Sequence, residues 1–441
     1  MKDCDLLPYL QAQLKTLAPQ CDNFKIALSG GMDSVVLLHL FSRLHNGKVM
    51  AHHVHHGLSA HADDWLLFCS TLCKALNVDF CATRVHLDKK NRSSLEAVAR
   101  EHRYKALQEN ASVTTCLVTA HHQDDQLESI LLALKRGAGL TGLQGVLATQ
   151  KLPKGMLIRP LLDVSRQQIE DYAALFSLAW IEDESNQDQR FDRNFIRHSI
   201  TPLLKARWPS IAKTAARSAL HCQAQQTLID ELTEVDFKLC IRRLLNDAVL
   251  NISALKALTA TRRSNVLRQW FKSVELAYPS TKQLIALWHD IALCDEGACP
   301  KMNFKSMSVR RYQDDLYFVD EQKMQIEKEV CVWKGEDILF LCAGKLQIKI
   351  SANAGFTAKQ HCVEIRFRQH LPASLSCQPI HRYASRSIKK LLHEYNLPPW
   401  LRAQVPFIFI DGELYAALGL WQCQMQKICL TTDETLSLSF V

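Results

Sequence analysis

The sequence lacks long hydrophobic runs. No stretch of 18 apolar residues occurs among its 441 residues, so it offers no candidate transmembrane helix. The first residues, MKDCD, do not open a secretory signal peptide, which needs a basic segment followed by an apolar one. These absences predict a protein that stays in the cytoplasm and does not contact a membrane.

No C-x-x-C pair occurs either, although the chain contains 16 cysteines. Structural zinc sites and thiol-redox sites usually present their cysteines in such pairs. Cys69 and Cys73 lie one helical turn apart, which favours packing in a core, and no other close pair has histidines at zinc-finger spacing. We therefore expect reduced, mostly buried thiols.

A Walker A motif, G-x-x-x-x-G-K-[ST], is also absent, but another glycine loop is present. Residues 24–28 show the alternation of a strand, and residues 35–44 form an apolar run typical of a helix. Between them lies the string SGGMDS, which consists of Ser29, Gly30, Gly31, Met32, Asp33 and Ser34. A loop of this composition at a strand–helix junction predicts phosphate binding rather than a plain turn.

Each part of this loop suits a nucleotide. The glycines let the backbone approach an anion, and the start of the helix directs N–H groups and a positive dipole end towards it. Asp33 would repel phosphate unless a divalent cation lay between them, so the expected ligands are ATP and Mg²⁺. SGGMDS resembles the PP-loop of the ATP-pyrophosphatase superfamily, whose members cleave ATP between the α- and β-phosphates and transfer AMP to a substrate oxygen.

Strand and helix patterns alternate from residue 24 to about residue 120, which predicts a parallel sheet with helices on both faces. The expected second strand carries four histidines, His52, His53, His55 and His56. Neighbouring residues on a strand point to opposite faces, so a single metal ion fits them poorly. Two roles stay open for these histidines: they line a substrate or phosphate site, or they are simply solvated.

A capping box at Ser93 and Glu96 predicts the start of another helix. Arg100 and Arg103 lie three residues apart on that helix and share one face. They form either a clamp on polyphosphate or a solvated basic face, and their spacing does not decide between these roles.

The expected strand at residues 114–120 leads into a second polar cluster at the start of a helix. Its members are His121, Asp124, Asp125 and Glu128. Ligands of open α/β sheets bind beyond the carboxyl ends of the strands, where SGGMDS also lies. Acids often complement a helix dipole, but three acids beside a histidine exceed that need. We expect a cationic amine or a metal ion here, with Asp33 and Asp125 as metal ligands.

Five motifs follow one another in the order seen in tRNA(Ile)-lysidine synthetases, and the chain resembles that family closely over residues 20–210 and more loosely beyond. They are HVHHGL at 53–58, H-x-x-D-D-x-x-E at 121–128, RPLL at 159–162, DESN at 183–186 and R-N-x-I-R at 193–197. One departure is Ser129, where the family usually has threonine; the hydroxyl is kept.

This resemblance implies an ATP-dependent ligase. The enzyme would adenylate the wobble cytidine of tRNA(Ile) with anticodon CAU and join free L-lysine to its C2, releasing AMP and pyrophosphate. The catalytic residues would be Asp33, His121, Asp125, Arg100 and Arg103. The residues of this domain that bind lysine or tRNA would be Asp124, Asp125, Glu128, Arg193, Asn194 and Arg197. The oligomeric state stays open, with a homodimer as one option.

Three domains are expected. A catalytic PP-loop domain spans residues 1–210, a helical tRNA-contacting domain spans 211–325, and a smaller α+β domain spans 330–441. The net charge of +8 suits an anionic partner. Cations greatly outnumber acids between residues 364 and 402. The residues there that we expect to bind tRNA are Arg382, Arg386, Lys389 and Lys390, and the resemblance implies contact with the acceptor stem.

Three other classes of protein fit less well. A PP-loop tRNA thiolase passes sulfur through C-x-x-C pairs or an iron–sulfur cluster, which the cysteine spacing does not support. Amidotransferase relatives need a glutaminase half, which is not visible. A tRNA-binding protein with a degenerate nucleotide fold should have lost Asp33 or the acidic cluster, and both are intact.

Overall fold

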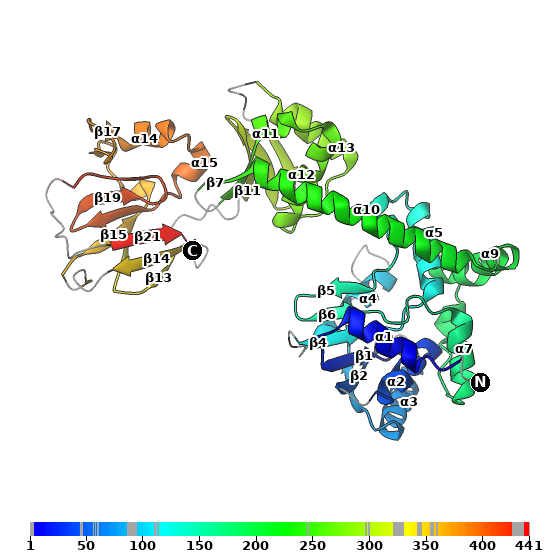
Figure 1. Cartoon of the computed structure of the whole chain (residues 1–441). Coiled ribbons are helices and arrows are strands. Elements are labelled where there is room, and N and C mark those ends of the chain that lie inside the picture. Colours follow the sequence, from blue (N-terminus) through cyan, green and yellow to red (C-terminus); the bar gives the residue numbers. More distant parts are fainter. Residues whose placement is uncertain are drawn as a thin grey trace. The chain divides into compact units, whose positions relative to one another are not determined.

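The protein is described from a computed structural model (Figure 1). It forms two compact units, residues 1–229 and 230–441, and each is described by itself. The structure describes residues 4–44, 47–55, 57, 59, 61–85, 95–109, 112, 114–244, 247–295, 298, 300–320, 330–341, 346–352, 357–358, 360–425 and 436–440.

The first unit is built on a six-stranded sheet of order β3-β2-β1-β4-β6-β5. Every neighbouring pair is parallel except β5 with β6. The strands are β1 (Asn23–Ala27), β2 (Lys48–His55), β3 (Asp79–Arg84), β4 (Thr115–Val118), β5 (Thr149–Lys151) and β6 (Met156–Ile158). The chain leaves β1 towards β2 on one side and returns to β4 on the other, which makes the β1–β4 junction the expected ligand position. The predicted parallel α/β sheet is confirmed.

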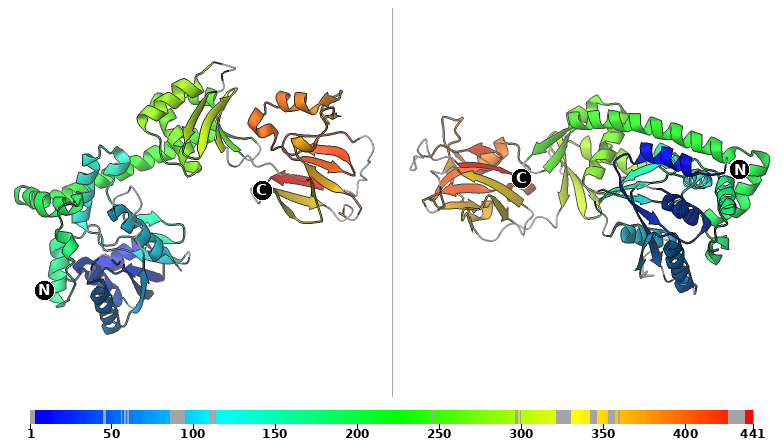
Figure 2. Two further views of the ribbon diagram at one scale, coloured as in Figure 1. Left: turned by 180° about the vertical axis from the view of Figure 1, so that it is seen from behind. Right: turned by 60° about the horizontal axis from the view of Figure 1, so that its bottom comes forward.

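Helices cover both faces of this sheet (Figures 1 and 2). Side chains of α1, α2, α3 and α7 join one core cluster with β1, and Leu107 of α4 packs with Leu117 and Leu157 in another. The two clusters take alternate residues of β4, as the pleat requires. The helices are α1 (Leu7–Leu17), α2 (Met32–Ser42), α3 (Ala62–Ala75), α4 (Leu95–Gln108), α5 (Gln123–Lys135), α6 (Leu140–Leu143), α7 (Arg166–Leu175), α8 (Asp192–Phe195) and α9 (Thr201–Arg207).

Helix α2 lies at the centre of the first core. Its apolar residues from Val35 to Leu38, with Leu40 and Phe41, are fully buried. A helix that is apolar on nearly every side is stable only inside a core. The loop that precedes α2 is therefore attached to one of the most deeply buried elements of the unit, which fixes the position of SGGMDS.

One pair of cysteines contradicts the expectation of reduced thiols throughout. Cys21, just before β1, forms a disulfide with Cys116 of β4, and their Cα atoms lie 6.3 Å apart. Adjacent strands bring the two residues together although 95 positions separate them, so their spacing in the sequence carried no signal. Cys69 and Cys73 are buried free thiols, as expected.

A long helix, α10 (Ile211–Cys240), follows a turn at residues 209–210. Residue 210, the predicted end of the catalytic domain, lies in that turn, whereas the boundary between the two compact units falls after residue 229, inside α10. The division into three domains stays a prediction.

The next part of the chain contains more strand than the helical pattern predicted. A five-stranded sheet of order β7-β8-β11-β10-β9 packs against helices through Trp270 and Phe271. Its strands are only four to six residues long, too short for their alternation to stand out beside the helices. Its elements are β7 (Ile241–Leu244), β8 (Asp247–Asn251), α11 (Ile252–Ala257), α12 (Ala260–Ser273), α13 (Thr281–Ala286), β9 (Lys301–Phe304), β10 (Met307–Tyr312) and β11 (Asp315–Asp320).

The C-terminal part mixes strands and short helices, as predicted. A sheet of order β12-β15-β18-β19-β20 lies in one core with the sheet β13-β14-β21, and a hairpin pairs β16 with β17. The elements are β12 (Cys331–Val332), β13 (Ile338–Leu341), β14 (Leu346–Ala352), β15 (Val363–Arg366), β16 (Ser376–Cys377), β17 (Arg386–Ser387), α14 (Ile388–Glu394), α15 (Pro399–Arg402), β18 (Phe407–Ile410), β19 (Glu413–Ala417), β20 (Trp421–Gln422) and β21 (Leu436–Phe440).

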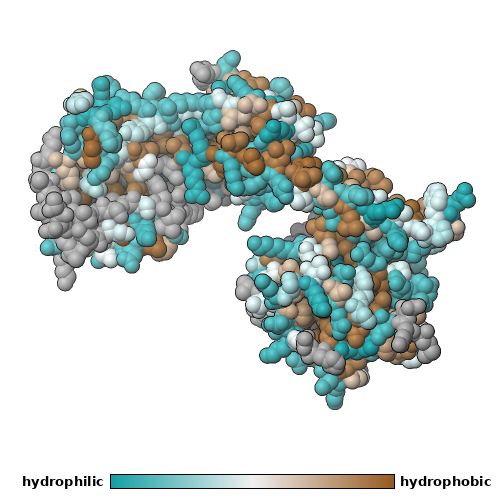
Figure 3. Space-filling view, viewed as in Figure 1, coloured by the Kyte–Doolittle hydropathy of each residue, from teal (hydrophilic) through white to brown (hydrophobic). Residues whose placement is uncertain are grey.

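Among the described residues, no helix is both long enough and apolar enough to cross a membrane. The visible surface is largely hydrophilic and is interrupted by apolar patches (Figure 3).

Candidate active site

The backbone of the glycine loop requires glycine at its second position. Gly30 has a φ of +91°, a backbone conformation that residues other than glycine rarely adopt. Its carbonyl oxygen accepts a hydrogen bond of 2.9 Å from the N–H of Ile181, and a Cβ on Gly30 would lie 2.6 Å from Cδ1 of Ile181. The loop is therefore held against the segment that follows α7.

Gly30→Ala is expected to lower the free energy of unfolding by roughly 1–3 kcal/mol, because alanine at this φ is strained. Denaturant unfolding of the two proteins measures the difference. Gly31→Ala is the matched control, since its added Cβ would meet only Oγ of Ser29, at 3.6 Å, and its φ is negative. Equal losses for the two variants would mean that the positive φ is not what selects glycine.

The two serine hydroxyls of the loop hold it together. Oγ of Ser34 accepts hydrogen bonds from the N–H groups of Ser29 and Gly30, each at 3.2 Å, and donates to the carbonyl of Gly31 at 2.9 Å. Met32 packs into the core. Because α2 begins at Met32, its first N–H groups have no partner within the helix. Binding of a phosphate by this loop stays a prediction.

Asp33 lies between two basic side chains. Its Oδ1 accepts a hydrogen bond of 2.7 Å from Nη1 of Arg166, and its Oδ2 lies 3.6 Å from Nε2 of His122. Arg166 is the first residue of α7, and its Nε is held 3.0 Å from the carboxylate of Glu170. Asp33 remains 29% exposed, so its carboxylate stays within reach of a ligand.

His122 connects the glycine loop to the acidic cluster. Its Nδ1 caps α5 by accepting the N–H of Asp124 at 3.3 Å, while its Nε2 lies 3.6 Å from Asp33 and 3.7 Å from Asp125. Burial lowers the pKa of His122, but the carboxylates of Asp33, Asp125 and Asp124 outweigh this effect and the net pKa is raised. A positively polarised imidazole edge therefore separates the two acids that follow β1 and β4.

Two arginines occupy the inner part of the acidic cluster. Glu128 is almost fully buried; its two oxygens lie 2.6 Å from Nε of Arg193 and 2.7 Å from Nε of Arg197. Arg193 also pairs with Asp125 at 2.6 Å. Burial raises the pKa of Asp125, but His122 and Arg193 lower it by more. The net pKa is lowered, so this acid stays ionised. Arg193 and Arg197 come from one helical stretch, four residues apart, and so share a face.

Asp124 is the least satisfied member of the cluster. Its Oδ2 pairs with Nζ of Lys205 at 2.5 Å. Its Oδ1 is buried and has no hydrogen-bond partner within the part of the chain that the structure describes. A buried carboxylate oxygen without a partner is costly, so this atom is a natural acceptor for a ligand cation.

The other predicted site residues have contacts of their own. Nδ1 of His121 lies 2.9 Å from Oγ1 of Thr119, and Nδ2 of Asn194 donates to the carbonyl of Asp188 at 3.0 Å. The guanidinium of Arg103 lies 5.8 Å from the ring of Tyr104. Ser93 and the side chains of Glu96 and Arg100 lie outside the described residues, so the predicted capping box stays a prediction. Arg382, Arg386, Lys389 and Lys390 belong to the second unit.

The histidines of β2 are not solvated. His52, His53 and His55 are all buried, so that interpretation is wrong for them. Nδ1 of His53 is bonded to the carbonyl of Leu28 at 2.9 Å, and Nε2 of His52 to Oγ1 of Thr83 at 2.9 Å. His53 thus braces the end of β1, directly before the glycine loop. His56 lies outside the described residues.

The sequence did not single out His122, Arg166 or Lys205. His122 stands next to His121, and only its capping geometry shows which of the two faces Asp33. Arg166 lies 133 positions from Asp33, and Lys205 lies 81 positions from Asp124. The one local signal is the capping box of Ser165 and Gln168. It fixes the start of α7 and so makes Arg166 the first residue of that helix.

Comparisons with known proteins cover most of the chain. Three family models match, described as a PP-loop domain at residues 7–204, a TilS substrate binding domain at 250–317 and a TilS substrate C-terminal domain at 363–433.

Curated relatives match nearly full length. The tRNA(Ile)-lysidine synthase of Coxiella burnetii is 36% identical over 428 residues, which cover 96% of this chain and 94% of the relative. Those of Vibrio parahaemolyticus and Photorhabdus laumondii are 37% and 39% identical; the matches cover 94% and 92% of this chain and 93% and 92% of the relatives. The chain therefore belongs to the tRNA(Ile)-lysidine synthase family.

Proposed function

We propose that this chain adenylates the wobble cytidine of tRNA(Ile) with anticodon CAU and joins free lysine to C2 of that base, with release of AMP and pyrophosphate. The observation that carries this proposal is the position of His122 between Asp33 and Asp125. It places the nucleotide loop and the acidic cluster side by side, as consecutive reactions on one base require.

The first half-reaction needs neutralisation of negative charge. Cytidine O2 attacks the α-phosphate of ATP, and pyrophosphate leaves. This adenylation turns O2, which is a poor leaving group, into a good one. Carboxylate oxygens are ligands that Mg²⁺ prefers, and this ion commonly takes one or two of them together with phosphate oxygens. Asp33 would supply one, and Asp125 would supply a second by giving up its contact with Arg193 or with the N–H of His122. Bound there, Mg²⁺ would neutralise pyrophosphate. In this proposal the N–H groups at the start of α2 and the guanidinium of Arg166, which pairs with Asp33, would bind the same phosphates.

The second half-reaction needs a site for a lysine ammonium. Both oxygens of Glu128 are already paired with arginine, whereas Oδ1 of Asp124 is buried and free of partners among the described residues. Asp124 therefore binds the incoming amine in this proposal, with Asp125 beside it. His121 follows the same strand and accepts the proton that the amine loses as it attacks C2.

An assay with labelled lysine tests the proposal. Purified protein, ATP, Mg²⁺ and unfractionated tRNA should yield acid-precipitable label that survives mild alkali, which removes aminoacyl esters. Omission of ATP should abolish it. Correctly folded protein that leaves tRNA unlabelled would refute lysidine formation, and transfer of sulfur in place of lysine would support the thiolase alternative.

The second unit is proposed to anchor tRNA by its phosphates. Replacing Arg382, Arg386, Lys389 and Lys390 by alanine should raise KM for tRNA and leave kcat at saturating tRNA nearly unchanged, as expected for uniform binding. A plot of log affinity against log salt concentration should become shallower, by about one unit of slope for each phosphate that no longer pairs with a cation. Lys238→Ala, at an exposed lysine paired with Glu234, is the control. A large fall in kcat with KM unchanged would contradict the anchor.

A further inference from the structure

A fully exposed tyrosine lies in the second unit between two arginines in the sequence, Arg382 and Arg386. Tyr383 lies in the loop that joins β16 to β17, and no part of its ring is covered. Single exposed apolar side chains are ordinary on protein surfaces, so exposure alone assigns no role. What points to a role is the set of hydrogen bonds that holds its loop and the basic residues next to it.

The loop is braced from within. Nε2 of Gln378 donates to the carbonyl of Arg382 at 3.0 Å, and the N–H of Arg382 donates to the carbonyl of Pro379 at 2.9 Å. The guanidinium of Arg382 also pairs with Glu394 of α14. The residue directly before Tyr383 is therefore fixed by backbone and side chain, and the ring is presented from a defined position.

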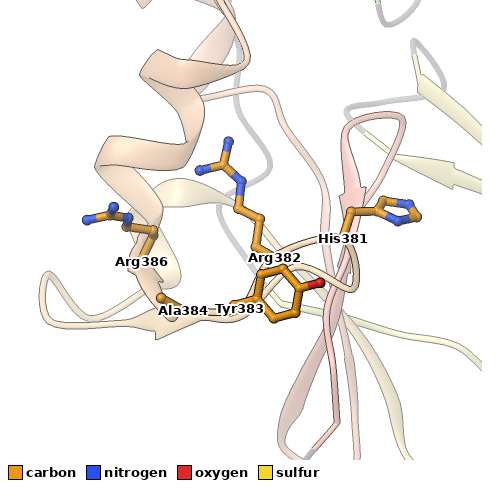
Figure 4. A pocket seen from close by; sticks show the side chains of 5 residues that line it. All are labelled: His381, Arg382, Tyr383, Ala384 and Arg386. Carbon is orange, nitrogen blue, oxygen red and sulfur yellow. The ribbon is translucent and has the colours of Figure 1, made fainter.

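Basic residues lie near the ring. Figure 4 shows Tyr383 between the guanidinium groups of Arg382 and Arg386 on one side and His381 on the other. These residues and Ala384 line an open hollow of about 300 Å³. Lys389 and Lys390 are exposed on the first turn of α14, directly after the hairpin. A flat, exposed aromatic face next to basic side chains is thus offered to a ligand.

The ligand must combine negative charge with a flat face of its own. RNA has both, but the bases of a duplex are already stacked above and below and leave no face free. Unpaired bases stack on aromatic side chains, while neighbouring cations bind the backbone phosphates. An acidic peptide would satisfy the cations and leave the ring unused.

We propose that Tyr383 stacks on an unpaired nucleobase of the bound tRNA, whose phosphates contact Arg386 and the lysines of α14. This inference rests on the proposed function, because it takes tRNA as the ligand of the second unit. The base comes either from the unpaired 3′ end of the tRNA or from one of its loops. In both cases the stacked face, not a hydrogen bond to the tyrosine hydroxyl, supplies the affinity.

Equilibrium binding of tRNA to the full chain, without ATP or lysine, tests the inference. Tyr383→Ala should weaken binding roughly 5- to 150-fold, the range for loss of one base–aromatic stack. The salt slope should stay unchanged, since no ion is released, and Tyr383→Phe should bind like the parent. Phe340→Ala is the matched control, because that exposed aromatic of β13 follows the acidic residues Glu336 and Asp337.

A second arm identifies the source of the base. If the 3′ end supplies it, a tRNA trimmed of its unpaired 3′ nucleotides should bind the parent and Tyr383→Ala equally. If a loop supplies it, the cost of Tyr383→Ala should persist with the trimmed tRNA. Equal binding of untrimmed tRNA by the parent and Tyr383→Ala would overturn the stacking, as would full affinity in Tyr383→Leu. A parent protein that bound no tRNA would instead refute the proposed function.

Discussion

Asp33→Asn is expected to reduce ATP-dependent pyrophosphate release by roughly 100- to 1,000-fold, the range for loss of one preorganised electrostatic interaction at a reacting centre. The carboxylate would bind Mg²⁺ and also orients Arg166, from which it accepts a hydrogen bond of 2.7 Å. Asparagine has the same shape but no charge, so both roles are weakened together. Pyrophosphate release with saturating tRNA, measured without lysine, isolates this step.

The fold should survive that change. The turn after β1 depends on Gly30 and on the hydroxyl of Ser34, and the partly exposed Asp33 carboxylate contributes to neither. The unfolding temperature should therefore change little. Asp64→Asn, at an exposed acid in the first turn of α3, should leave both readouts unchanged. Pyrophosphate release within a few-fold of the parent rate would remove Asp33 from the metal site.

The sequence could predict those parts of the candidate site that depend on a few consecutive residues. SGGMDS combines a required positive φ at Gly30 with the start of a helix, and the run from His121 to Glu128 places its acids on the first turns of α5. Both follow strands whose pattern is visible locally. The rule that ligands bind beyond the carboxyl ends of such strands then places the two clusters at one edge of the sheet.

The partners of these residues could not be predicted, because folding brings them from distant positions. Arg166 reaches Asp33 from α7, and Arg193 and Arg197 reach Glu128 from α8 and the turn after it. The sequence showed acids without their cationic partners and so suggested an open site for an amine or a metal ion. Among the described residues, Oδ1 of Asp124 is the oxygen of these acids that the structure leaves buried without a hydrogen-bond partner.

The middle of the chain was predicted least well for a related reason. Strands β9 to β11 gain their stability from pairing with one another and from packing on Trp270 and Phe271, not from local pattern. The disulfide between Cys21 and Cys116 likewise depends on β1 and β4 being neighbours.

Asp124→Asn is expected to impair the lysine step and spare adenylation. Its Oδ1 is the buried acceptor without a partner among the described residues, and a charge-assisted hydrogen bond to an ammonium contributes roughly 1.5–3 kcal/mol, about 10- to 100-fold in kcat/KM for lysine. Adenylated tRNA should accumulate when ATP, tRNA and lysine are supplied, while single-turnover pyrophosphate release stays within a few-fold of the parent.

The matched control for that variant is Asp192→Asn. Asp192 forms the same kind of pair, 2.5 Å from Nζ of Lys135, but on the surface, where both side chains are more than half exposed. Loss of an exposed pair should cost less than about 1 kcal/mol of stability and should not affect either half-reaction. If Asp124→Asn slowed pyrophosphate release as much as lysine transfer, Asp124 would belong to the nucleotide site, and the amine would have to bind by displacing an arginine from Asp125 or Glu128.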